Sequence, residues 1–78
     1  MKKRAKPNES KRDKFVRLAN RRTNAVLTQL KILGNCSNKY AYNYAEEDVN
    51  KIFKEIDKRV KETKARFRSS LKKEFRLQ

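Results

Sequence analysis

Apolar side chains recur at every third or fourth position along two long segments of this chain, with polar side chains between them. This spacing predicts amphipathic α-helices over residues 10–33 and 45–76. The apolar seam expected on the first helix consists of Phe15, Val16, Ala19, Thr23, Val26, Leu27, Leu30 and Leu33. The seam expected on the second consists of Val49, Phe53, Ile56, Val60, Thr63, Phe67 and Leu71. Two such seams predict an all-α fold, an antiparallel two-helix hairpin, and its small core favours dimerisation.

The ends of the two expected helices carry typical start and stop signals. Asn8 or Ser10 can cap the first helix, and Gly34 stands where a C-cap with positive φ is common. Residues 34–38 indicate a turn, and the tyrosines that follow at a spacing of two indicate an ordered loop. Three acidic residues, 46–48, open the second helix, where the helix dipole favours anions. Magnesium binding by these carboxylates is the less favoured interpretation.

The net charge of the chain indicates a polyanionic partner. The 78 residues carry 23 Lys or Arg against 9 Asp or Glu, a net charge of +14 that a small domain tolerates best beside a polyanion. The excess is concentrated in residues 1–39, which hold 12 basic and 2 acidic side chains. We expect residues 1–9 to form a flexible basic arm and residues 10–78 to form one helical hairpin domain.

Several function classes are disfavoured by composition. The chain has no His and a single Cys, Cys36, so the usual general base, metal ligands and disulfides are missing. We therefore expect no enzyme, no cofactor and no metal site. A lone cysteine fits the reducing cytoplasm. We expect no secretory signal and no membrane span, because the apolar runs are short. An amphipathic helix on a membrane surface is disfavoured because Trp is absent and the second helix mixes charge signs.

The function that these features favour is nucleic-acid binding, with RNA slightly preferred over DNA. The face opposite the first seam is rich in cations and amides, which bind phosphates and reach bases or ribose hydroxyls. Basic arms of this kind fold onto RNA or follow DNA phosphates. The candidate contact residues are Lys2, Lys3, Arg4, Lys6, Arg12, Lys14, Arg17, Asn20, Arg21, Arg22, Asn24 and Lys31. Tyr40, Tyr42 and Tyr44 could stack on unpaired bases, although closing the hairpin against Val49 and Leu33 is the favoured role.

The alternative is a protein-interaction module that docks on a nucleoprotein complex. Its contact surface would consist of two groups of apolar residues. One group lies outside the seam of the first helix, and the other lies near the chain's end and projects past the shorter helix. These are Leu18, Ile32, Phe67, Leu71, Phe75 and Leu77. Net positive charge would then steer the chain to an acidic or nucleic-acid-bearing partner.

Residues 22–53, RTNAVLTQLKILGNCSNKYAYNYAEEDVNKIF, resemble a group of short basic helical proteins of low-GC Gram-positive bacteria and their mobile elements. In that group a Thr often stands at the position of Ala45, as an N-cap before the acidic turn. The resemblance covers about two fifths of the chain and implies no particular activity. The missing Thr leaves the start of the second helix less sharply defined.

Overall fold

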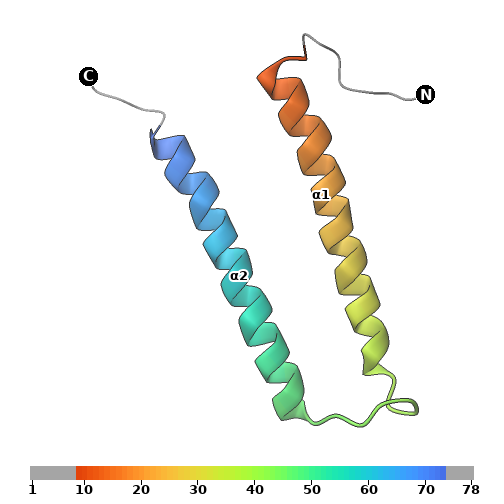
Figure 1. Ribbon diagram of the computed structural model, residues 1–78. Helices are drawn as coiled ribbons and strands as arrows, with labels where there is room; N and C mark the ends of the chain where they lie inside the picture. Colours follow the sequence, from red (N-terminus) through yellow and green to blue (C-terminus); the bar gives the residue numbers. More distant parts are fainter. Residues whose placement is uncertain (1–8, 74–78) are drawn as a thin grey trace, which may run out of the picture. The chain divides into compact units, whose positions relative to one another are not determined.

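The computed structural model describes the backbone of residues 9–73 and the side chains of residues 9–72. Within this part of the chain the regular structure is helical, without a strand. Helix α1 spans Lys11–Gly34, the short 3₁₀ helix η1 spans Asn35–Ser37, and helix α2 spans Glu46–Lys73 (Figure 1). The prediction of an all-α chain with two long helices is therefore confirmed. The expected arm, apart from Glu9, and the expected helical residues 74–76 lie outside the described residues.

Helix α1 begins at the predicted cap. The Asp13 N–H donates a hydrogen bond to the Ser10 hydroxyl at 3.0 Å, and the Lys14 N–H donates to the Ser10 carbonyl at 2.9 Å. Ser10 has extended backbone angles, as an N-cap residue requires. Asp13 in the first turn and Lys31 in the last turn both complement the helix dipole. The local sequence is therefore sufficient to explain where this helix starts.

The prediction of a positive φ at Gly34 was wrong. Gly34 has φ −59° and ψ −25°, which are right-handed helical angles. The helix continues as the 3₁₀ turn η1, and the Asn35 N–H donates to the carbonyls of Ile32 and Leu33. Because the tightened turn satisfies these late carbonyls, the chain needs no left-handed residue to leave the helix.

The segment between the helices is an ordered loop, as predicted. The Tyr40 N–H donates to the Asn38 side-chain oxygen at 2.9 Å, which is an Asx turn. The N–H groups of Ala41 and Tyr42 both donate to the Asn38 carbonyl. This turn separates Tyr40 from Tyr42, so the segment is not one extended stretch.

Helix α2 begins at Glu46, and one of the three acidic residues of its first turn caps it. Ala45 has no side-chain acceptor, but the Asp48 carboxylate accepts a hydrogen bond from the Ala45 N–H at 2.9 Å. The Ala45 carbonyl accepts from the N–H groups of Asp48 and Val49. This arrangement is one half of a capping box, with Asp48 in the place usually held by Glu. This contact defines the start of α2 although Ala45 stands where similar sequences are expected to have a capping Thr.

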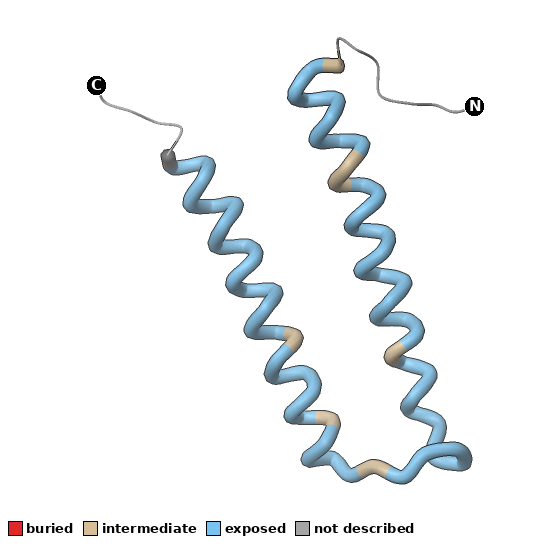
Figure 2. The backbone as a smooth tube through the Cα atoms, viewed as in Figure 1, coloured by how far each residue is buried: buried red, intermediate tan, exposed pale blue. Residues whose placement is uncertain are grey.

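The described residues contain no buried side chain. The chain divides after Tyr42 into two units, each built around one long helix. In α1 only Leu18, Ala19 and Leu33 are half-buried, and in α2 only Val49 and Ile56 are (Figure 2). The remaining seam residues of each unit are exposed. Each unit is therefore an amphipathic helix whose apolar seam is open to a further partner.

Candidate nucleic-acid interface

The candidate contact residues of α1 form a regular row. Six hydrogen-bond donors follow one another at spacings of three and four residues, and all are exposed: Lys14, Arg17, Arg21, Asn24, Thr28 and Lys31. At about 100° per residue they occupy a band about 100° wide, centred about 150° from the middle of the apolar seam. The row extends over about 25 Å of helix. We call it the α1 row; Asn20 is also exposed and lies at its edge.

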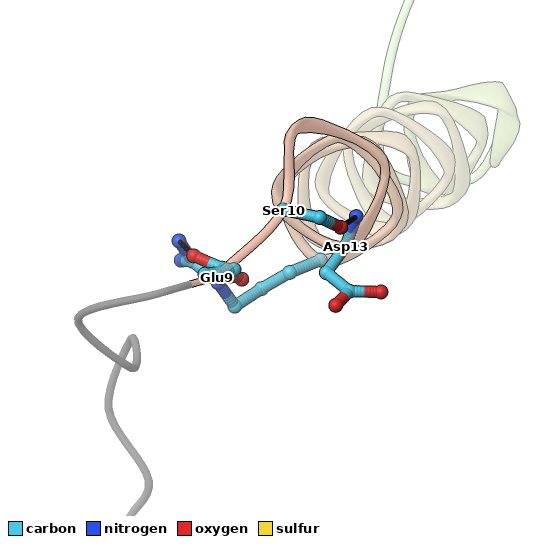
Figure 3. A network of polar contacts seen from close by, with 4 residues as sticks. Glu9, Ser10 and Asp13 are labelled. Carbon is cyan, nitrogen blue, oxygen red and sulfur yellow. Dashed lines mark hydrogen bonds and ion pairs between the residues drawn. The ribbon is translucent and has the colours of Figure 1, made fainter.

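One cation of this row has a carboxylate partner that sequence reasoning missed. The Arg17 Nε and Nη2 atoms donate to the two carboxylate oxygens of Glu9, each at 2.9 Å. Such a two-pronged contact is the geometry in which an arginine also binds phosphate. Figure 3 shows Glu9 beside the start of α1, near the Ser10 cap. The only signal in the sequence is Glu9 itself, the one acidic residue among the first twelve.

The pKa of Arg17 shifts upwards because of this contact. The hydrogen bonds from the guanidinium to Glu9 raise the pKa, partial desolvation opposes the shift, and the charge of Glu9 adds to it. Arg17 therefore stays fully charged in the neutral range. The Glu9 carboxylate occupies two of the five N–H groups of Arg17 and adds a negative charge, so it competes with a phosphate for that edge of the guanidinium. Lys14, Arg21 and Lys31 have no such competitor among the described residues.

Two other candidate cations of α1 lie off the row. Arg12 is exposed, and its guanidinium carbon is 5.8 Å from the centre of the Phe15 ring, within the range of a cation–π contact. By helical position Arg12 falls on the apolar side of α1 and Arg22 at the margin of the seam. These two residues therefore belong to a different face from Arg17 and Arg21. Lys2, Lys3, Arg4 and Lys6 lie outside the described residues.

The apolar residues that the sequence proposed for protein contact differ in exposure. Leu18 is half-buried, whereas Ile32 is 51% exposed, Phe67 54% and Leu71 70%. Phe75 and Leu77 lie outside the described residues. Ile32 is thus more accessible than Leu18, and Phe67 and Leu71 mark the accessible end of the α2 seam.

The loop offers few groups with special chemistry. Tyr40 is fully exposed, Tyr42 is 53% exposed and Tyr44 is half-buried. Cys36 is exposed and carries a free thiol. The part of the chain that the structure describes contains no group of three or more His, Cys, Asp or Glu side chains able to hold a metal ion. Among the acidic residues 46–48, Asp48 has a structural role as the cap of α2.

Comparison with protein-family models, with curated proteins and with solved structures finds no match to this chain. Among the described residues no helix is both long enough and apolar enough to cross a lipid bilayer.

Proposed function

We propose that this protein is a small non-enzymatic nucleic-acid-binding protein that contacts phosphates through the α1 row and the N-terminal arm. The observation that supports this function is the α1 row itself, because it aligns four cations and two neutral donors on one exposed face. Asp13 is the one acidic side chain on that face by helical position. Binding to phosphates through several aligned cations is largely independent of sequence.

RNA is the slightly preferred partner. Asn24 in the row and Asn20 beside it can reach ribose hydroxyls or unpaired base edges, which RNA presents in its shallow groove and loops. The fully exposed Tyr40 adds a ring that an unpaired base could stack on. These contacts would add modest selectivity to an interaction dominated by phosphates.

We further propose that the two seams pair to form an antiparallel hairpin and that hairpins dimerise. Support comes from exposed seam residues on both helices, including Val26, Leu27 and Val60. Burying apolar surface contributes about 25 cal/mol per Å², so an uncovered seam of this length favours association. Sedimentation of the purified chain over a range of concentrations tests this. A strictly monomeric chain at every concentration would exclude the dimer.

The nucleic-acid proposal is tested by binding of the full chain, freed of co-purified nucleic acid, to fluorescent duplexes of RNA and of DNA. Anisotropy titrations from about 50 to about 300 mM salt give the slope of log affinity against log salt. Lys14→Gln with Arg21→Gln should make the slope shallower by up to about 1.8 on duplex DNA. Lys64→Gln with Arg66→Gln removes the same charge from helix faces outside any row and serves as the matched control.

Two outcomes would contradict the proposal. The first is wild-type binding that is weak and disappears by about 150 mM salt, since a dedicated binder retains affinity there. The second is an equal effect of the α1 pair and of the control pair, which would mean that only net charge matters.

The second candidate function is docking on a nucleoprotein complex, and the exposure of Ile32 and Leu71 favours it. A photocrosslinking residue at Ile32 would then form adducts with a partner protein, and one at Asn24 would form none with nucleic acid. The reverse pattern supports the first function. The resemblance suggested by the sequence of residues 22–53, to short basic helical proteins of low-GC Gram-positive bacteria and their mobile elements, favours neither function, because it implies no activity.

We place the protein in the cytoplasm. Cys36 is an exposed free thiol, and such a thiol persists best in a reducing compartment.

A further inference from the structure

Helix α2 carries a second row of cations that the proposed function does not use. Its members follow at the same three- and four-residue spacing as the α1 row, with Ala65 standing at the one position that lacks a charge. We call this set the α2 row, and all of its members are exposed: Lys51, Lys54, Lys58, Lys61, Arg68 and Lys72. The row extends over about 32 Å, one cation for every 6 Å or so of helix.

The α2 row lies on the far side of the helix from the seam. At about 100° per residue its members occupy a band about 100° wide, centred about 150° from the middle of the apolar seam. The seam and the row can therefore be occupied at the same time. A chain whose seam is covered still presents these six cations to solvent.

Neighbouring cations of the row repel one another. Lys51, Lys54, Lys58 and Lys61 form three successive like-charge pairs at helical contact distance, and each pair destabilises the helix. Glu47 stands within the band, and Asp57 and Glu62 stand at its edges, each three or four residues from a cation of the row. Among the described residues none of the three carboxylates is within ion-pair distance of the row.

By contrast, α2 does pair a cation that stands off the row. The Arg59 Nε donates to the Glu55 carboxylate at 2.9 Å. A helix that pairs Arg59 but leaves six aligned cations open is suited to an external polyanion, which would relieve the repulsion between them.

The position of the row favours nucleic acid over a lipid surface. If the seam of α2 entered a bilayer, the row would point away from the headgroups, because it lies nearly opposite the seam. A sugar–phosphate backbone is a rod of regularly spaced anions and matches a straight row of cations. Lysine, which binds phosphate as a point charge, suits contacts that need no fixed orientation.

We infer that the α2 row is a second phosphate-binding surface for nucleic acid, separate from the α1 row and equally independent of base sequence. This inference rests on the proposed function, since it assigns a second helix to the same class of partner. Each phosphate contact adds about 0.9 to the salt slope on duplex DNA, so the two rows together predict a steeper dependence than either row alone.

The test compares two double variants of the full chain on the same fluorescent RNA and DNA duplexes. Lys58→Gln with Lys61→Gln removes two charges from the row, and Lys64→Gln with Arg66→Gln removes two charges about 100° to either side of it. Gln and Lys have similar helix propensity, and circular dichroism verifies that helicity is retained. Lys58→Arg with Lys61→Arg keeps the charge and should bind like wild type.

The row variant should make the slope shallower by about 1.8 and weaken DNA binding about 30-fold at about 150 mM salt, as the loss of two phosphate contacts requires. The control variant, Lys64→Gln with Arg66→Gln, should lose much less DNA affinity. If the α2-row variant and the control variant lose the same affinity while Lys14→Gln with Arg21→Gln loses more, the proposed function holds and the second surface is refuted. If the wild-type chain binds neither duplex near 150 mM salt, the proposed function fails and this inference fails with it.

Discussion

Glu9→Gln is expected to strengthen nucleic-acid binding. In the free protein the two carboxylate oxygens of Glu9 occupy the Nε and Nη2 edge of Arg17, one of the two edges that can bind a phosphate, and place a negative charge beside it. Gln at this position removes the negative charge and accepts through one oxygen instead of two. Arg17 then has a weaker, neutral competitor, and the α1 row gains at most one effective phosphate contact.

The size of the gain in affinity follows from the counterions that the nucleic acid releases on binding. One additional contact makes the slope of log affinity against log salt steeper by about 0.9 on duplex DNA and about 0.7 on single strands. Referred to 1 M salt, a slope increment of 0.9 corresponds to about 5-fold tighter binding at 150 mM, about 15-fold at 50 mM and about 3-fold at 300 mM. These factors are upper limits, since the Gln side chain retains part of the contact.

Anisotropy titrations of wild type and Glu9→Gln at three salt concentrations measure both the gain and its decline with salt. The matched control is Asp13→Asn, which removes one negative charge from the first turn of α1 without releasing Arg17. In Figure 3 the Asp13 carboxylate points away from Glu9. The control should raise affinity slightly and leave the slope nearly unchanged.

Equal changes of the salt slope in Glu9→Gln and Asp13→Asn would refute competition between Glu9 and phosphate for Arg17. That result would mean that Glu9 acts only through net charge and that Arg17 does not reach a phosphate. A second check is the double variant Glu9→Gln with Arg17→Gln, in which the gain should disappear because its acceptor is gone.

Four further predictions concern stability and pH. Gly34→Ala should stabilise α1 by about 0.4–1 kcal/mol in thermal unfolding, because φ is negative and the added Cβ meets no atom within 4 Å beyond its own turn of helix; destabilisation would point to a left-handed Gly34. Ala45→Thr should complete the capping box and stabilise α2 by about 1 kcal/mol, and an unchanged melting temperature would argue against Ala45 as the N-cap. Val60→Ala should destabilise a paired seam by about 1 kcal/mol, because two lost methyls outweigh the better helix propensity, whereas an unpaired helix would gain up to about 0.6 kcal/mol. Binding should be flat between about pH 6 and pH 8, since the chain has no His and the stabilisation from the raised Arg17 pKa is lost only well above this range.

Much of the local structure was predictable because its causes are local. The spacing of apolar residues determines which segments can form amphipathic helices, and Ser10 followed by Asp13 marks a helix start within four residues. Asn38 can form an Asx turn because its own side chain reaches the backbone two residues on. In each case the interacting groups are so close in sequence that no distant part of the chain can alter the outcome.

Three features were not predictable because more than one local structure can satisfy the same backbone or side-chain groups. Gly34 could end α1 in the left-handed region, but the 3₁₀ turn η1 satisfied the same carbonyls with right-handed angles. The start of α2 lacked a capping side chain at Ala45, and Asp48 supplied the cap from the opposite direction. Glu9 could have faced solvent, and it instead closed on Arg17 eight residues away.

The sequence by itself therefore determined the helices, their faces and the placement of cations opposite each seam. These depend on the helical period alone, and the α2 row could have been found from it. Which cations of a row are open to a ligand was decided only by the folded structure. Arg17 and Arg21 are equivalent in the pattern, but a competing carboxylate reaches only one of them, because side-chain pairing depends on the path of the backbone at residue 9.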